Sequence, residues 1–99
     1  LAERMRMKAV EESPKQAHRY AELAEFYIDQ DEPEKAWPPA KKASELEPGS
    51  ARYLELSLET AILLGDSEEA KERFQKLRLL IEDQSRFQSW KKKIDELEK

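Results

Sequence analysis

Residues 20–48 read YAELAEFYIDQDEPEKAWPPAKKASELEP, and this stretch decides the fold. Its first half places apolar and small residues at the three- and four-residue spacing of one helical face, at Tyr20, Leu23, Ala24 and Tyr27. Its second half begins with a proline, which suits a first helical turn. A stripe of small residues follows, formed by Ala36, Ala40 and Ala43. Because small side chains let two helix backbones approach closely, the stretch predicts two tightly packed helices.

The same plan recurs along the chain at a spacing of 34 residues. Under that shift many positions match, and most of them are small or apolar. Examples are Ala2 with Ala36 and Ala70, Ala9 with Ala43, Pro14 with Pro48, Ala17 with Ala51, Glu25 with Glu59, and Ile28 with Ile62. A repeat of this length indicates stacked helix pairs. We therefore expect an all-α fold, an α-solenoid of antiparallel helix pairs with about six helices.

Turn and capping signals divide the chain into units. Pro48-Gly49-Ser50 ends one helix, and Ser50 can cap the next. Gly65 supplies a turn, and Asp66 and Glu69 have the spacing of a capping box. We expect residues 1–16 to hold the second helix of a truncated preceding repeat, 17–50 and 51–84 to be full repeats, and 85–99 to be a C-terminal capping helix.

The two end helices have amphipathic patterns. We expect the first to turn one side inward, carrying Ala2, Met5, Ala9 and Val10. The last has a single apolar stripe, formed by Phe87, Trp90, Ile94 and Leu97. A helix with one buried face is typical of the cap that keeps a repeat array soluble. The truncated first helix exposes an apolar edge. We expect it to be covered either by the upstream repeat of a longer protein or by a second copy, which would give a homodimer.

Residues 20–48 resemble the tetratricopeptide repeat. That family has Trp, Leu, Gly and Tyr in its first helix, then Ala, an aromatic residue and Ala in its second helix, closed by Pro. Here Tyr20 stands for the Trp, Ala24 for the Gly and Ala40 for the aromatic residue, while Pro48 matches the closing Pro. The resemblance covers nearly the whole chain and is weaker after residue 50. A generic helical bundle is the alternative.

Pro38 and Pro39 depart from this pattern, because they fall inside an expected helix. An interior proline removes a hydrogen bond and costs about 3 kcal/mol. The helix is expected either to kink here or to restart at Pro39. Trp37 then either packs against a neighbouring helix, which we favour, or is presented to a partner on a bulge.

Composition excludes several classes of function. The net charge of −4 argues against a nucleic-acid platform, which needs clustered Lys and Arg. The chain has no cysteine, so thiolate metal sites and cysteine nucleophiles are excluded. Its apolar runs are far shorter than the ~20 residues that cross a bilayer, so no membrane insertion is expected. The sequence leaves the compartment open, with the cytoplasm favoured.

Catalytic, metal and cofactor sites are not expected. His18 is the one histidine, and scattered glutamates around a single imidazole do not make a triad or a metal site. We therefore predict that the chain is not an enzyme. A role as an accessory domain of a larger enzyme or assembly factor, or as a structural or self-assembling segment of a longer solenoid, stays open as an alternative.

Partner binding is the favoured function. In tetratricopeptide arrays the first helices of successive repeats line a concave groove, so the resemblance implies a groove here. On a helical wheel, the side chains beside the core stripe project into this groove. Ala21 and Leu63 are assigned to the groove in the same way. The predicted partner-binding residues are His18, Glu25, Ile28, Asp29, Arg52, Glu55, Glu59 and Ile62. Since this surface is mostly acidic, we expect a protein or peptide partner that is basic or of mixed charge.

Overall fold

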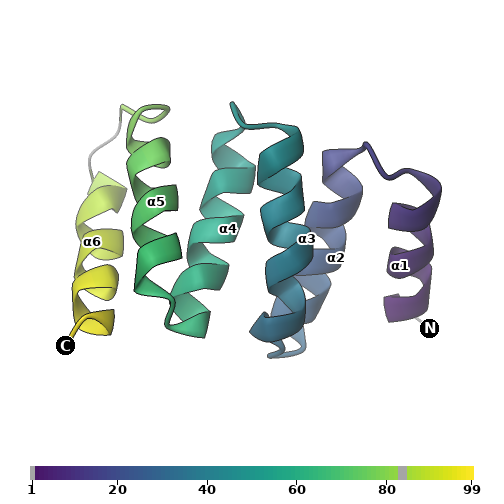
Figure 1. Cartoon of the computed structure of the whole chain (residues 1–99), viewed down its shortest axis with the longest axis horizontal. Helices are drawn as coiled ribbons and strands as arrows, with labels where there is room; N and C mark the ends of the chain where they lie inside the picture. Colours follow the sequence, from purple (N-terminus) through teal and green to yellow (C-terminus); the bar gives the residue numbers. More distant parts are fainter. Residues whose placement is uncertain (1, 83–84) are drawn as a thin grey trace.

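Over the described residues, every regular element is an α-helix (Figure 1). The computed structural model describes residues 2–82 and 85–99. Within these ranges the chain forms six helices and no strand, as the sequence predicted. The helices are α1 (Ala2–Glu12), α2 (Ala17–Asp29), α3 (Pro33–Leu46), α4 (Ala51–Leu64), α5 (Ser67–Arg78) and α6 (Ser85–Leu97). Position 1 of the first predicted unit and positions 83 and 84 of the third lie outside the described residues.

The helices alternate in direction and stack side by side along one axis (Figure 1). Each helix packs against its neighbours in the chain, and α4 also contacts α2 and α6. Within the described residues the backbones of α1, α3 and α5 do not approach one another closely. Helices on the inner side of a curved stack come closer together than those on its outer side. We therefore call α2, α4 and α6 the inner row, and α1, α3 and α5 the outer row.

The predicted capping signals begin and end the helices. The Tyr53 N–H donates to Ser50 Oγ at 3.3 Å at the start of α4. The Glu69 N–H donates to Asp66 Oδ1 at 3.1 Å at the start of α5. These side chains satisfy backbone donors that have no partner within the helix. Gly65 ends α4 with a φ of 75°, a left-handed conformation that suits a residue without Cβ.

The interface between α2 and α3 consists largely of alanine. Its small side chains are at most 2 % exposed, and they are Ala17, Ala21, Ala24, Ala36, Ala40 and Ala43. Leu23 and Tyr27 add the larger buried side chains of this first cluster. Small residues on both helices allow the backbones of α2 and α3 to approach closely, as the pattern in residues 20–48 predicted.

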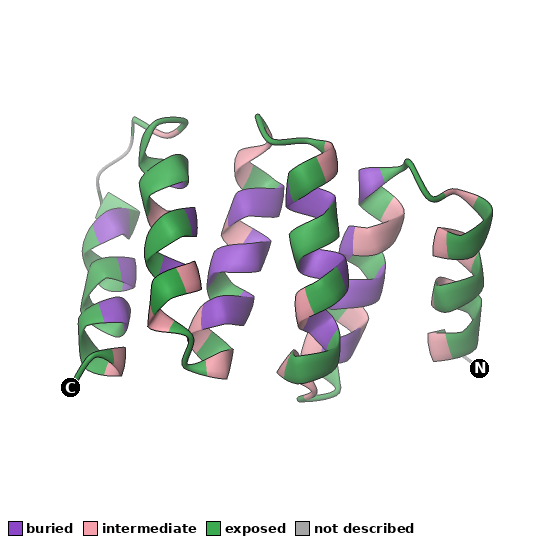
Figure 2. Cartoon of the chain, in the orientation of Figure 1, coloured by how far each residue is buried: buried purple, intermediate pink, exposed green. Residues whose placement is uncertain are grey.

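Larger side chains form a second cluster between α4, α5 and α6. Leu58 and Leu77 are fully buried, and the stripe of α6 supplies Phe87, Trp90 and Ile94. Figure 2 shows the buried residues of these three helices on the sides that face one another. The predicted amphipathic stripe of α6 is therefore confirmed.

The two interior prolines neither end nor restart the third helix, which runs unbroken from Pro33 to Leu46. Trp37 packs against the second cluster. The Arg73 guanidinium lies over its ring, 5.4 Å from the centroid. The packed arrangement of Trp37 is thus the one that the structure adopts, and the side chain links α3 to α5.

The prediction for the inward side of α1 was wrong in part. Ala2 is exposed and Met5 is 69 % exposed, and no residue of this helix is buried. The side that faces α2 instead carries Glu3 and Arg6, the latter with its guanidinium 5.1 Å from the Phe26 ring centroid. Burial, and then a hydrogen bond with Glu3, raises the pKa of Tyr27. Val10, which was also predicted to face inward, does pack against the first cluster. Polar side chains with long stems share this boundary with it, where the sequence predicted only small and apolar ones.

Candidate functional site

An open hollow of about 350 Å³ lies between α2 and α4, on the inner row of the stack. We call it the α2–α4 hollow. Its lining residues are Glu25, Ile28, Asp29, Arg52, Glu55, Leu56 and Glu59. The predicted partner-binding residues, apart from His18 and Ile62, therefore come together around one hollow.

Helix geometry explains this convergence. Glu25, Ile28 and Asp29 are three and four residues apart, so they share one face of α2. Arg52, Glu55 and Glu59 share one face of α4 in the same way. Because α2 and α4 contact each other, the two faces meet. Leu56 was missed, since its spacing places it at the edge of the core stripe, where it is 9 % exposed.

Other predicted members of the groove lie elsewhere. His18 is exposed in the first turn of α2, outside the hollow. Ile62 is half-buried and packs against the second cluster. Ala21 is wholly buried in the first cluster, so its assignment to the groove was wrong. Leu63 is 58 % exposed but does not line the hollow.

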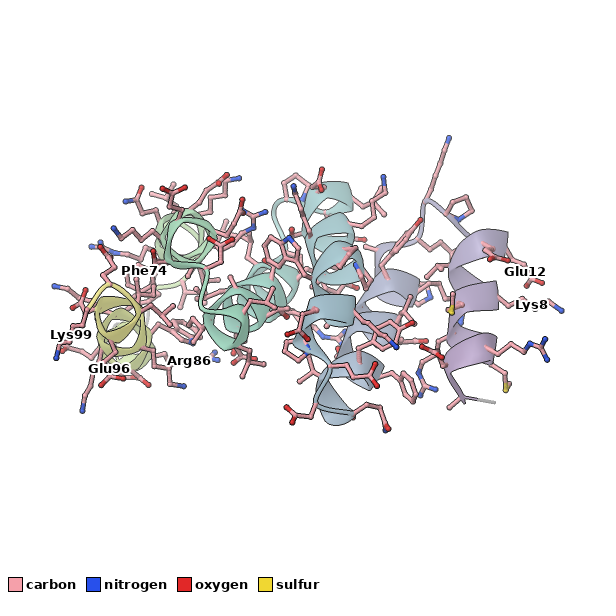
Figure 3. All side chains as sticks on the ribbon, turned by 60° about the horizontal axis from the view of Figure 1, so that its bottom comes forward. Lys8, Glu12, Phe74, Arg86, Glu96 and Lys99 are labelled. Carbon is pink, nitrogen blue, oxygen red and sulfur yellow. The ribbon has the colours of Figure 1, made fainter. Side chains whose placement is uncertain are left out.

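Ion pairs cross the inner row from helix to helix. Arg52 Nη2 lies 3.0 Å from Glu25 Oε1 and joins α4 to α2. Arg86 of α6 pairs with Glu55 of α4 and also lies over the Trp90 ring, 4.7 Å from its centroid. Figure 3 shows Arg86 on the side of α6 that faces α4. The side chains of these pairs are partly exposed, so solvent and salt screen the attraction.

Glu59 has a different environment from the paired carboxylates. Burial raises the pKa of its carboxyl group, and the positive charge of Lys93 partly offsets that rise. Lys93 lies on α6, two helical turns beyond Arg86, so both cations occupy one face of that helix. The inner row therefore carries carboxylates on α2 and α4 and cations on α4 and α6.

The sequence analysis did not assign the two cations of α6 to the groove, and two signals could have placed them there. Arg86 and Lys93 are seven residues apart, a spacing that returns to the same face of a helix. Arg86 also stands one 34-residue repeat after Arg52. Their presence makes the face more mixed in charge than predicted. Asp29 forms no ion pair with any described residue, so it is the lining carboxylate most available to a ligand.

A smaller hollow of about 230 Å³ lies between α5 and α6. The rings of Phe74 and Phe87 form its apolar part, with centroids 5.8 Å apart in an edge-to-face arrangement. Arg78 and Lys91 stand beside them. No sequence signal had marked this site.

In residues 2–82 and 85–99 no group of three or more His, Cys, Asp or Glu side chains could hold a metal ion. None of the helices there combines the length and the apolar content needed to cross a membrane. No protein-family model matches the chain, and no curated protein matches it either.

Proposed function

We infer that this chain is a helical module that binds a protein or peptide partner on its inner row. The α2–α4 hollow carries the proposal. It combines an apolar floor with the carboxylate of Asp29, which makes no ion pair within the described residues. The tetratricopeptide resemblance supports it, since the first helices of that family's repeats line a groove. A catalytic role is not proposed, because His18 is the one imidazole and lies outside the hollow.

The lining of the hollow indicates which side chain of a partner would enter. Ile28 and Leu56 offer an apolar surface for an aliphatic stem. Asp29 and Glu59 offer carboxylates at the rim. Lysine and arginine combine such a stem with a cationic head, and charge-assisted hydrogen bonds to carboxylate are the stronger kind. The proposed partner therefore inserts a basic side chain between α2 and α4.

Next to the hollow, the existing ion pairs favour a partner of mixed charge. Arg52 and Arg86 already neutralise Glu25 and Glu55 in part. A purely basic peptide would be repelled by these arginines, whereas an acidic residue flanking the basic one could pair with them. Such contacts are exposed, so we expect binding to weaken as salt concentration rises.

Selection of peptides from a random display library on the wild-type chain tests the proposal. The selected peptides should carry Lys or Arg beside an acidic residue. Asp29→Lys should weaken their binding by about tenfold, because an attraction of the order of 1 kcal/mol becomes a repulsion. Glu45→Lys is the matched control, since Glu45 is exposed on the outer row and makes no ion pair within the described residues.

Isothermal titration calorimetry with one selected peptide measures both variants. Equal affinity of the peptide for wild type and Asp29→Lys would overturn the assignment of the hollow. Equal weakening by Asp29→Lys and Glu45→Lys would do so too, because net charge alone would then govern binding.

A further inference from the structure

The 34-residue repeat places a second surface on the inner row, equivalent to the α2–α4 hollow but between α4 and α6. These two helices contact each other as α2 and α4 do. Glu59 belongs to both places, because it lines the hollow and also stands one repeat after Glu25. We call the second place the α4–α6 face. The other residues that the repeat assigns to it are Ile62, Leu63, Arg86, Ser89, Trp90 and Lys93.

The framework of the two places is similar. Ile28 and Ile62 are equivalent under the repeat, and both are half-buried. Leu56 and Trp90 are equivalent as well, and both are buried. Each place also has one arginine on its later helix, and this arginine pairs with a glutamate of the earlier helix. The two surfaces therefore differ mainly in their remaining residues.

Three carboxylates of the hollow are replaced at the α4–α6 face. The replacements are Leu63 for Asp29, Ser89 for Glu55 and Lys93 for Glu59. The hollow has four carboxylates and one arginine among its lining residues. The α4–α6 face instead has one carboxylate and two cations. The charge of the inner row thus changes from negative at the hollow to positive at the next place.

Leu63 and Lys93 take the places that Asp29 and Glu59 have at the hollow, and both are open to solvent. Leu63 is 58 % exposed. A single exposed leucine is common on protein surfaces, but this one stands one repeat after a lining residue of the hollow. Lys93 is also exposed and forms no ion pair with any residue that the structure describes. The α4–α6 face therefore offers an apolar side chain and an ammonium group to a ligand.

We propose that the partner presents its residues in a fixed order along the inner row. Its basic side chain enters the α2–α4 hollow. At the α4–α6 face an apolar residue packs on Leu63, and a further acidic residue beside it pairs with Lys93. This order rests on the proposed function, because it extends the same bound segment by one repeat. A segment placed in the opposite order would bring its basic residue to Lys93 and its acidic residue to Asp29, so like charges would meet at both places.

The repeat also sets the distance between these residues of the partner. Packed helices lie about 8–10 Å apart, so the two places are separated by roughly one such step. A polyproline II segment advances about 3.1 Å per residue and returns to the same side after about 9 Å, which is every third residue. The apolar residue of the partner should therefore stand about three positions from the basic one, with the acidic residue next to it.

The peptides selected on the wild-type chain, as described for the proposed function, test this order. They should share an apolar residue about three positions from the basic one, with an acidic neighbour. In calorimetry with one such peptide, Lys93→Glu should weaken binding by about fivefold, because an attraction becomes a repulsion. Leu63→Ser should weaken it by about threefold, since an apolar contact is lost. Circular dichroism of each variant checks that the helices still form.

Two matched controls carry the same kinds of change at other exposed positions. Lys92→Glu alters the neighbouring lysine of α6, which the repeat does not assign to the α4–α6 face. Leu79→Ser alters a leucine at the end of α5, outside the inner row. Both controls should bind the peptide as the wild type does. A peptide whose acidic residue is changed to lysine should bind Lys93→Glu more tightly than it binds the wild type, because opposite charges meet again.

The outcomes separate this order from the proposed function. If Asp29→Lys weakens binding of the peptide whereas Lys93→Glu and Leu63→Ser do not, the order along the inner row is refuted and the proposed function stands. If Asp29→Lys has no effect, or if no peptide is selected, the proposed function fails as well. Equal weakening by Lys92→Glu and Lys93→Glu would also refute the order, since the position of the charge on α6 would then not matter.

Discussion

Pro38 offers a quantitative test of how α3 tolerates proline in its interior. Pro38 and Pro39 both lie well inside this helix, which runs from Pro33 to Leu46. Neither ring nitrogen carries a hydrogen, so the bonds to the carbonyl oxygens four residues earlier, on Glu34 and Lys35, cannot form. The two rings differ in environment, because Pro38 is exposed whereas Pro39 is buried.

The expected effect of Pro38→Ala follows from these facts. An interior proline is about 3 kcal/mol less favourable than alanine in a helix. Loss of the ring also frees the unfolded chain, which destabilises the variant by about 0.4–1 kcal/mol. Because the exposed ring leaves no cavity, the free energy of unfolding should rise by about 2 kcal/mol. For a domain of this size that corresponds to a Tm higher by roughly 8–16 °C.

Pro39→Ala provides the contrast. It restores the same kind of hydrogen bond, this time to Lys35, but it removes two methylene groups from a buried position. Each buried methylene contributes about 0.8 kcal/mol, and an incompletely filled cavity adds to the loss. The net change in the free energy of unfolding should therefore be near zero.

Urea denaturation followed by circular dichroism, together with calorimetry, measures both variants. The slope of the free energy against urea should stay the same, since the surface exposed on unfolding is nearly unchanged. If Pro38→Ala has the wild-type Tm or a lower one, the missing hydrogen bond does not limit the stability of α3. Equal stabilisation by both substitutions would contradict the contribution assigned to the buried ring of Pro39.

Glu59, Arg73 and Gly65 each provide a separate test. An NMR titration of Glu59 should give a pKa above its ordinary value of 4.5, because burial disfavours the carboxylate. The folded state then binds the proton more tightly than the unfolded state does. The stability of wild type relative to Glu59→Gln should therefore rise as the pH falls from neutral through that pKa. A stability difference that falls with decreasing pH would contradict the burial of this carboxyl group. Arg73→Ala should lower the free energy of unfolding, measured by urea denaturation, by about 2 kcal/mol. The reason is that the variant loses a guanidinium that lies 3.0 Å from Glu69 and over the Trp37 ring. A loss below about 0.5 kcal/mol would argue against a stabilising contact between Arg73 and these two residues. Gly65→Ala should cost about 1 kcal/mol by the same assay because φ is 75°, whereas Gly49→Ala, with no atom within 4 Å of the added Cβ, should be neutral.

The elements governed by local chemistry were predictable from the sequence. Ser50 and Asp66 accept the expected backbone hydrogen bonds, and Gly65 has the left-handed conformation that a turn after α4 requires. The alanine stripe of residues 20–48 packs between α2 and α3 as its small side chains allow. Each of these features depends on neighbours within a few residues, which is why the pattern alone was sufficient.

Features that depend on several helices at once were less predictable. In α1 the side facing α2 is filled by Arg6 and Glu3, whose long side chains cover apolar surface while remaining polar at their ends. A wheel that counts apolar residues therefore chose Met5 for the inward side, although that residue is mostly exposed. Ala21 was misplaced because α2 is flanked by more than one helix, and a single core stripe does not describe it.

The candidate site was predictable helix by helix but not as a charged surface. The spacing of the carboxylates along α2 and α4 was enough to predict that they line one hollow, as they do. Arg86 and Lys93 were not assigned to the groove because α6 was treated as a cap, although both residues lie on the same inner row. The balance of charge on that row is therefore a property of three helices together.

The alanine interface between α2 and α3 has a consequence for motion. A methyl group has no alternative rotamer, so the alanines of this interface are held in place at no cost in side-chain entropy. These two helices should therefore move as a single rigid body. Bending of the module is then expected at other boundaries, such as α1–α2, where the longer side chains of Glu3 and Arg6 meet Tyr27 and Phe26. A partner lying along the inner row would be accommodated by rotation of whole helix pairs, with no change inside α2–α3.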